Sequence, residues 1–286
     1  MNTIDPRAIG AQIRMRIPQL TPLEVRVVDA ITGRRDLTDE TSLKHIAEDS
    51  AVSEAMIVKI AKKLGFNGFR DFRSALVQYN QSEVANMYSE ISPDDSSAAV
   101  IQKVFRTSMQ ALEETIAILD IAAFDRAADI LSHARHRDFY GIGGSAQIAR
   151  DVAHKFLRIG LRASIYDDAH MMLMSAAVLK PDEAAVAFSH SGKTTAVLEP
   201  LELARKNGAR TIAVTNYPDS PIARAAEVVL CSTAQGSPLL GENAAARIAQ
   251  LNILDALFVV IAQRDFRAAE TNLKLTMGAV QAKRKT

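Results

Sequence analysis

The chain has 286 residues, of which 48% are apolar, and its 34 Lys and Arg balance 33 Asp and Glu. At about 100 to 200 residues per domain, this length predicts two domains, each large enough to bury a core. A net charge of +1 excludes a polybasic nucleic-acid coat and an acidic disordered tail. The single cysteine, Cys231, excludes an intramolecular disulfide and a cysteine-based zinc cluster, and we expect it to be a small buried side chain.

The N-terminal segment lacks the continuous apolar run that a signal peptide needs. The longest apolar stretches, such as residues 171–179, end well short of the about 18 residues that cross a bilayer. The sequence therefore predicts a cytoplasmic protein with no membrane segment.

The first 80 residues are predicted to form a helical domain, because apolar residues recur every three or four positions and β-branched runs are few. Ser53 is expected to be an N-cap and Gly65 a C-cap. The polar stretch that follows contains Pro93 among aspartates and serines, and it predicts a linker over 81–105. The expected helices cover 22–31, 42–49 and the segment between Ser53 and Gly65.

The rest of the chain, over 106–286, alternates short apolar runs with helical segments of about 10 to 15 residues. This alternation is typical of βαβ units, in which helices cover both faces of a parallel sheet. A helix over 100–119 precedes the first strand, and an apolar helix over 243–262 closes the domain. The expected strands cover 138–142, 163–166, 184–188, 211–215 and 228–231.

Residues 42–65 have the pattern of a helix-turn-helix. In this motif the first helix buries a small residue, the turn carries an apolar plug, and the second helix buries one stripe of side chains. Ala47 supplies the small residue and Val52 the plug. The buried stripe of the second helix comprises Ile57, Ile60, Ala61 and Leu64. The positions left to face outward and to reach a DNA groove are Ser53, Glu54, Met56, Lys59, Lys62 and Lys63.

Charge supports DNA binding only locally, since residues 1–90 contain 12 basic and 12 acidic side chains. From Asp36 to Glu54 six acids and one base give a net charge of −5, and from Ala55 to Ala75 five bases and one acid give +4. Basic side chains there, Arg70 among them, are expected to bind phosphates, while the N-terminal half of the helix reads base edges. The alternative is an ordinary three-helix bundle with a solvated lysine face.

A glycine-rich loop follows the expected strand over 138–142, where Gly143, Gly144 and Ser145 lead into a helix. Such a turn lets backbone N–H groups approach an anion at the positive end of the helix. Residues 141–146 also fit the G-x-G-x-x-A pattern of a dinucleotide site, and Asp167 and Asp168 stand where its acidic residue is expected. This loop alone leaves a dinucleotide site open.

A second loop, Ser-His-Ser-Gly-Lys-Thr over 189–194, follows the expected strand over 184–188 and also precedes a helix. It is not a P-loop, because Ala187 stands where that motif requires its earlier glycine. A dinucleotide site has no use for a second anion-binding loop, whereas a small phosphorylated ligand held between two loops does. The alternative for each loop is a tight strand-to-helix turn with a serine N-cap.

Taken together, these segments resemble the RpiR/MurR family of bacterial transcription regulators, which join a helix-turn-helix domain (1–80) to an α/β sugar isomerase (SIS) domain (106–286). The resemblance covers nearly the whole chain. Its most specific parts are KKLGFNGFRDFR over 62–73, SHSGKT over 189–194 and ARIAQLNILDAL over 246–257. Relatives commonly carry an arginine and an aromatic where this chain has Lys59 and Ile60, and a lysine loses bidentate reading of guanine.

The resemblance implies that serine and threonine side chains of the two loops hold the phosphate of a sugar, together with backbone N–H groups. His190 occupies the variable second position of the second loop, and Glu242, just before the closing helix, is expected to reach the sugar. The implied ligand-binding residues are Gly143, Ser145, Ser189, His190, Ser191, Gly192, Thr194 and Glu242.

We therefore expect a DNA-binding transcriptional regulator of sugar metabolism that a sugar phosphate modulates, with no catalytic residue, cofactor or metal. Its expected partners are double-stranded DNA with a palindromic operator and further copies of the chain, in a homodimer or homotetramer. The helix over 243–262 either forms an interface between copies or packs within its own domain. The alternative is a sugar-phosphate isomerase or lyase, with Glu242, His190 and His170 as candidate general bases.

Overall fold

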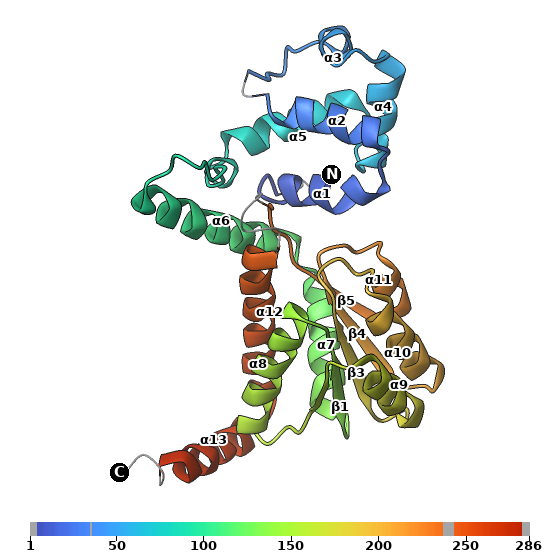
Figure 1. Ribbon diagram of the computed structural model, residues 1–286, viewed down its shortest axis with the longest axis vertical. Helices are drawn as coiled ribbons and strands as arrows, with labels where there is room; N and C mark the ends of the chain where they lie inside the picture. Colours follow the sequence, from blue (N-terminus) through green and yellow to red (C-terminus); the bar gives the residue numbers. More distant parts are fainter. Residues whose placement is uncertain (1–4, 35, 237–242, 282–286) are drawn as a thin grey trace. The chain divides into compact units, whose positions relative to one another are not determined.

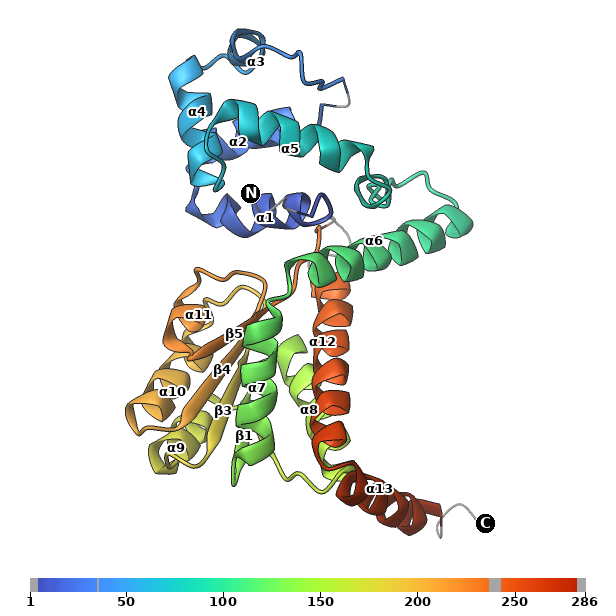
Figure 2. The same cartoon turned by 180° about the vertical axis from the view of Figure 1, so that it is seen from behind.

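The computed structural model describes residues 5–34, 36–236 and 243–281, and the chain divides into two compact units (Figures 1 and 2). One unit comprises Met1–Ile118 with Thr233–Glu242, and the other comprises Leu119–Ser232 with Asn243–Thr286. The segment over 81–105, which we expected to be a linker, lies inside the first unit. It contains the short helix η2 (Val84–Asn86) and the first turns of helix α6 (Ser97–Ile118).

The first unit is helical, and several of its helices begin where the sequence places a cap. Thr21 and Glu24 form a capping box, and Ser42 and Ser53 each accept a backbone N–H with their side-chain oxygen. Its remaining helices are α1 (Ala8–Arg16), η1 (Ile17–Gln19), α2 (Pro22–Thr32), α3 (Leu43–Asp49), α4 (Glu54–Lys63) and α5 (Phe69–Gln81).

Helix α6 is held in this unit by a buried polar network that the sequence does not reveal. Helix α6 contacts α1, and the fully buried carboxylate of Glu114 pairs with Arg14. Tyr79 of α5 donates to the same carboxylate at 2.8 Å, and Gln110 donates to it at 3.2 Å. A buried carboxylate is strongly destabilising without such partners, so α6 cannot detach cheaply from α1 and α5.

The second unit contains a five-stranded sheet in the order β2-β1-β3-β4-β5, with every neighbouring pair parallel. This confirms the predicted α/β fold, and each observed strand lies within two residues of its predicted bounds. The strands are β1 (Arg137–Tyr140), β2 (Ser164–Tyr166), β3 (Ala184–Phe188), β4 (Arg210–Thr215) and β5 (Val228–Cys231).

Helices cover both faces of this sheet, as Figure 1 shows. Because side chains alternate along a strand, Phe139 and Phe188 face one layer and Tyr140 faces the other. The first layer consists of α7 (Ile121–His133), α8 (Gly144–Arg158), α12 (Asn243–Arg264) and α13 (Phe266–Gln281). The opposite layer consists of α9 (Ala169–Val178), α10 (Thr195–Lys206) and α11 (Pro221–Ala225).

Helix α12 is long and apolar enough to cross a membrane by length and composition. Ile253, Leu254 and Leu257 of this helix are buried in the core on the α7 and α8 face of the sheet. The core helix of a globular domain meets the same criteria, and 44% of the most apolar window of α12 is buried in this structure. Cys231 is in the last position of β5, and burial raises the pKa of its thiol to about 12.

Phe156 and Leu157 provide a test of this core, because they are consecutive residues of α8 with exposures of 0% and 55%. The ring of Phe156 packs edge-on against Phe139, with centroids 6.0 Å apart. Phe156→Ala should lower the free energy of unfolding of the α/β unit by about 3 to 5 kcal/mol. Leu157→Ala should change it by less than about 0.5 kcal/mol. Denaturant unfolding followed by circular dichroism measures both, and equal losses would contradict this core.

Candidate functional site

The two loops singled out in the sequence lie at one place in the sheet. Strands β1 and β3 are neighbours, with Tyr140 opposite Ala187. After β1 the chain passes through α8 to β2 on one side, and after β3 it passes through α10 to β4 on the other side. Ligands of open parallel sheets bind at such a reversal of strand order, outside the carboxyl ends of the strands. The fold therefore brings both loops to the expected binding edge.

The first loop turns tightly from β1 into α8. Gly141 is buried, and a Cβ at this position would lie 3.0 Å from the backbone carbonyl carbon of Ser145. Gly143, the N-cap of α8, has a φ of 61°, which disfavours a side chain there. The backbone N–H of Ser145 donates to Ile142 O at 3.2 Å, and its side chain is half-buried.

The second loop gathers hydroxyl groups. Ser189 is buried, and its Oγ lies 3.2 Å from Thr194 Oγ1, while Ser191 and Thr194 are half-buried. Gly192 has a φ of 63°, its N–H donates to Ser189 O at 3.1 Å, and a Cβ there would overlap Ser220 Oγ. Because no larger residue fits, Gly192 fixes the sharp turn that brings the hydroxyls of Ser189 and Thr194 together.

His190 is anchored on the β4 side of this loop. Its carbonyl oxygen accepts from Thr215 Oγ1 and from the backbone N–H of Asn216, both at 3.1 Å. Its ring meets the ring of Tyr217 edge-on, with centroids 6.1 Å apart. Lys193 is exposed, and its backbone N–H donates to Ser191 Oγ at 3.3 Å. Sequence reasoning missed Thr215, Asn216, Tyr217 and Ser220, which shape the loop from the neighbouring strand end.

The helices that start at the two loops differ from their neighbours at the N-terminus. Helices α7, α9 and α11 are capped by the side chains of Asp120, Asp168 and Ser220. Within the part of the chain that the structure describes, the N-caps of α8 and α10, Gly143 and Thr194, make no side-chain cap hydrogen bond. Backbone N–H groups at the positive ends of two helices therefore point to the edge where the hydroxyls gather, which is the chemistry that binds a phosphate.

One basic side chain was not among the predicted residues. Arg247, on the second turn of α12, lies beside the first loop, with its Cδ 3.8 Å and its Nη1 4.0 Å from the Cβ position of Gly144. The sequence shows an arginine near the start of the closing helix. Only the packing of α12 against α8 shows that this arginine lies beside the first loop. Glu242, the predicted sugar contact, lies outside the described residues.

Three aspartates of the second unit have local partners. Asp167 pairs with Arg150, and Asp168 caps α9 through the backbone N–H groups of His170 and Met171. His136 Nε2 lies 3.0 Å from Asp138 Oδ1, and burial raises the pKa of the Asp138 carboxyl. Within the described ranges, no three histidine, cysteine, aspartate or glutamate side chains form a group that could hold a metal ion.

The helix-turn-helix forms as predicted in the first unit. Val52 N donates to Ala47 O at 3.0 Å across the turn between α3 and α4, where Ala51 has a φ of 52°. Val52 packs partly buried against the core, and Ser53 caps α4. The predicted stripe of α4 is buried and comprises Ile57, Ile60, Ala61 and Leu64.

Most of the predicted DNA-binding side chains are exposed, and two are not. The exposed residues are Ser53, Glu54, Lys59, Lys62 and Arg70. Met56 is half-buried against the core, so the prediction that it faces outward is wrong. Lys63 also differs from the prediction, because its Nζ lies 2.7 Å from both carboxylate oxygens of the buried Glu24. This ion pair ties α4 to α2 and lowers the pKa of Glu24 to about 2.

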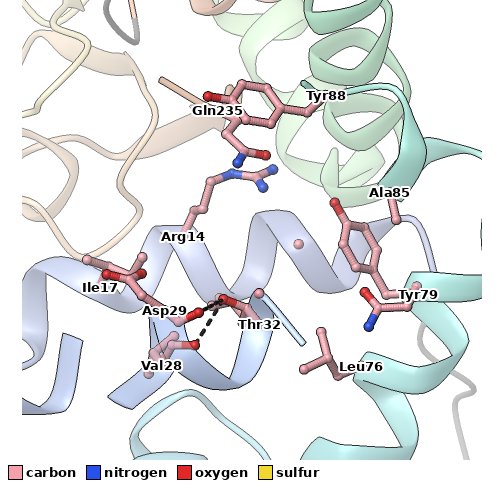
Figure 3. A pocket seen from close by; sticks show the side chains of 14 residues that line it. Arg14, Ile17, Val28, Asp29, Thr32, Leu76, Tyr79, Ala85, Tyr88 and Gln235 are labelled. Atoms are coloured by element: carbon pink, nitrogen blue, oxygen red, sulfur yellow. Dashed lines mark hydrogen bonds between the residues drawn. The ribbon is translucent and has the colours of Figure 1, made fainter. Parts of the chain in front are cut away.

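The first unit also contains a cavity of about 470 Å³ between α1, α2 and α5 (Figure 3). Arg14, Thr32 and Tyr79 line it, and Thr32 Oγ1 donates to Val28 O at 2.9 Å. Arg14 and Tyr79 are the groups that also hold Glu114 of α6. The cavity therefore borders the buried network that fixes α6 and is lined by helices other than α4.

Comparison with known proteins covers both units. Residues 8–83 match the helix-turn-helix domain of the rpiR family, and residues 130–260 match the SIS domain. The HTH-type transcriptional regulator RpiR of Escherichia coli strain K12 is 43% identical over 277 residues, which cover 96% of this chain and 93% of that protein. An uncharacterized HTH-type transcriptional regulator of Caldanaerobacter subterraneus is 32% identical over 256 residues, which cover 90% and 91% of the two chains.

A solved structure shares the fold over most of the length. It is the Vibrio vulnificus NanR protein complexed with ManNAc-6P, which superposes with a TM-score of 0.60 and 22% identity. The superposition covers 94% of this chain and 98% of that chain. At this identity the likeness shows the fold.

The Glu24–Lys63 pair makes a prediction about pH. Because the folded pKa of Glu24 is about 2, below the ordinary value of 4.5, the pair stabilises the first unit fully above about pH 4.5. This contribution is lost as the pH falls toward 2. Glu24→Gln should therefore destabilise the unit by about 1 to 3 kcal/mol at pH 6 and by roughly half as much or less at pH 3.

Thermal unfolding of both proteins at pH 6 and pH 3 measures this difference. Glu40→Gln is the control, because Glu40 is exposed and its replacement should have little effect at either pH. A Glu24→Gln penalty that stays constant across the two pH values would show that the ion pair is not the source of the stabilisation.

Proposed function

The chain belongs to the RpiR family of DNA-binding transcriptional regulators and carries an SIS domain, and we propose that a sugar phosphate bound at the β1 and β3 loops controls its affinity for operator DNA. The observation that carries the proposal is the pair of uncapped helix N-termini at the reversal of strand order. Ser189 and Thr194 place two hydroxyls there, 3.2 Å apart. Neutral donors converging on one point bind a phosphate group and leave the sugar free for other contacts.

The NanR complex supports this choice of ligand class. Its ligand, ManNAc-6P, is a phosphorylated amino sugar, and the fold that binds it covers 94% of this chain. In our proposal the phosphate lies between the first and second loops, against Gly143, Ser145, Ser189, Ser191, Gly192 and Thr194. His190 then contacts the sugar from the side of β4, and Glu242 is proposed as a further sugar contact, as the family resemblance implies.

The helix-turn-helix is proposed to bind DNA through the exposed face of α4. Ser53 and Glu54 lie at the N-terminal end of the helix, the part that reads base edges in this motif. Lys59, Lys62 and Arg70 are exposed and positively charged, and we assign them to backbone phosphates. Lys63 is left out of this set, because its ammonium group is held by Glu24.

Regulation follows if two copies bind a palindromic operator. Two recognition helices must be about 34 Å apart, or a multiple of this, to enter successive major grooves on one side of DNA. A ligand that binds one arrangement of the dimer or tetramer more tightly than another shifts the population toward it. The ligand therefore changes the affinity for the operator because it binds one of the two arrangements more tightly than the other.

An isomerase or lyase is the second candidate, because the SIS fold also carries those reactions. The relatives at 43% and 32% identity are both transcriptional regulators, which favours the regulator. An assay for turnover of pentose and hexose phosphates by the purified protein separates the two. Turnover that is lost in Glu242→Gln would establish the enzyme.

The ligand proposal predicts a stabilisation that depends on the second loop. A phosphosugar at a hundredfold excess over its Kd should stabilise the α/β unit by about 2.7 kcal/mol. In Ser189→Ala and Thr194→Val this thermal shift should fall strongly, whereas Ser132→Ala should retain it. Ser132 is the matched control because its hydroxyl donates to Ala128 O within α7.

Thermal shift with a panel of hexosamine, hexose and pentose phosphates measures this effect, and fluorescence anisotropy with operator DNA then measures the change in DNA affinity. If no phosphosugar in the panel changes either the unfolding temperature or the DNA affinity, the proposal that the protein senses a phosphosugar is refuted.

The DNA proposal predicts a change in salt dependence. Replacing Lys59 and Lys62 by alanine should weaken operator binding and reduce the slope of log K against log salt by about 0.9 for each phosphate contact removed. Lys180 and Lys206, exposed lysines of the second unit, form the control pair. Anisotropy titrations at several salt concentrations measure the slope. An unchanged slope in the Lys59 and Lys62 variant would show that α4 does not face the DNA backbone.

A further inference from the structure

Arg247 occupies a position that brings a positive charge to the first loop. It lies on the second turn of α12, and its Nη1 is 4.0 Å from the Cβ position of Gly144, the first residue of α8. The neighbouring residues Ala246, Ala249 and Gln250 are buried, and α12 contacts α8 along this side. The backbone under Arg247 is therefore fixed, and its side chain extends along the start of α8.

This position is electrostatically unfavourable for a cation when nothing else is bound. The N-terminal end of α8 carries a partial positive charge, and Arg247 also lies near the positive N-terminal end of its own helix. Among the residues that the structure describes, Arg247 has no hydrogen bond and no ion pair. Other arginines of the second unit differ in this respect, since Arg150 pairs with Asp167, Arg210 with Glu227 and Arg264 with Asp129.

The described residues leave space beside Arg247. Among them, a Cβ at Gly143 would meet no heavy atom within 4 Å beyond its chain neighbours, and a Cβ at Gly144 would meet only the side chain of Arg247. The exposed Arg247 thus borders one side of a clear approach to the backbone N–H groups of the first loop. An anion in this approach would relieve the repulsion between the guanidinium group and the end of α8.

We propose that Arg247 is the specificity-determining cation of the ligand site, which selects a dianionic phosphate group over a neutral sugar. This inference rests on the proposed function. The hydroxyls of Ser145, Ser189 and Thr194 and the backbone N–H groups carry no net charge, so they attract a phosphate through partial charges alone. A guanidinium group supplies a full charge and two parallel N–H donors that match two phosphate oxygens.

The test compares Arg247→Gln and Arg247→Lys with the wild-type protein, using inorganic phosphate as the probe. Charge-assisted hydrogen bonds contribute about 1.5 to 3 kcal/mol, so Arg247→Gln should weaken phosphate binding by about ten- to a hundredfold. Arg247→Lys should retain part of the affinity, because it keeps the charge and loses the paired donors. Arg267→Gln removes an exposed arginine of α13 and should leave the affinity unchanged. Isothermal titration calorimetry of the full chain gives each Kd.

Two further readouts separate a ligand contact from a structural role. Without phosphate, Arg247→Gln should unfold at the same temperature as the wild type or higher, because it removes an unbalanced charge. Inorganic phosphate takes its second negative charge near pH 7, about a unit above a phosphate monoester, so wild-type affinity should rise between about pH 6 and 8 and rise less in Arg247→Gln. Sulfate keeps the same charge over this range, and its binding should not show the rise.

The outcomes distinguish the two proposals. If Arg247→Gln binds phosphate as tightly as the wild type while Ser189→Ala binds it weakly, the role of Arg247 is refuted and the phosphate site stands. A lower unfolding temperature of Arg247→Gln without ligand, with an unchanged pH profile, would make Arg247 a structural residue. If neither phosphate nor any phosphosugar binds the wild type, the proposed function itself fails.

Discussion

The reversal of strand order between β1 and β3 is the constraint on which the candidate site depends. Because the chain leaves these adjacent strands toward opposite sides of the sheet, α8 and α10 begin beside each other and then diverge onto opposite faces. Two positive helix ends are thus fixed at one edge by the packing of the whole domain. Gly143 and Gly192 give the two turns their positive φ, and Gly192 also leaves room for Ser220 Oγ. The position of the candidate site therefore follows from the topology of the sheet and from these two turns.

In the helix-turn-helix unit, the basic surface is small: it is one face of α4, on a domain whose acidic and basic residues balance. The exposed lysines of α4 lie on one face, and the last lysine of the helix is used to hold α4 against α2 through Glu24. The cluster of basic residues therefore combines residues available to DNA with a residue that fixes the orientation of the helix. A near-zero net charge is compatible with DNA binding of this kind, since phosphates interact with local charges across a screening length of about 10 Å.

Features that depend on neighbouring residues could be predicted from the sequence, and contacts between residues far apart along the chain could not. The strands were found almost residue by residue because each is a short buried run, and the cap at Ser53 is read from neighbouring residues. Interactions between distant residues escaped prediction. Lys63 meets Glu24 across 39 residues, and Arg14 meets Glu114 across 100 residues, which holds α6 in the first unit. Arg247 escaped for the same reason, because Gly144 lies about a hundred residues earlier.

The path of the chain suggests how the proposed ligand would act on DNA binding. After β5 the chain enters Thr233–Glu242, which belongs to the first unit, and then returns to the second unit as α12. Arg247 lies within the first turns of that returning helix, beside the first loop. In our proposal, a phosphate that draws Arg247 toward α8 acts on a helix that is joined by a few residues to the unit that carries the recognition helix. Coupling under this proposal requires only that the ligand bind more tightly to one position of α12 than to another.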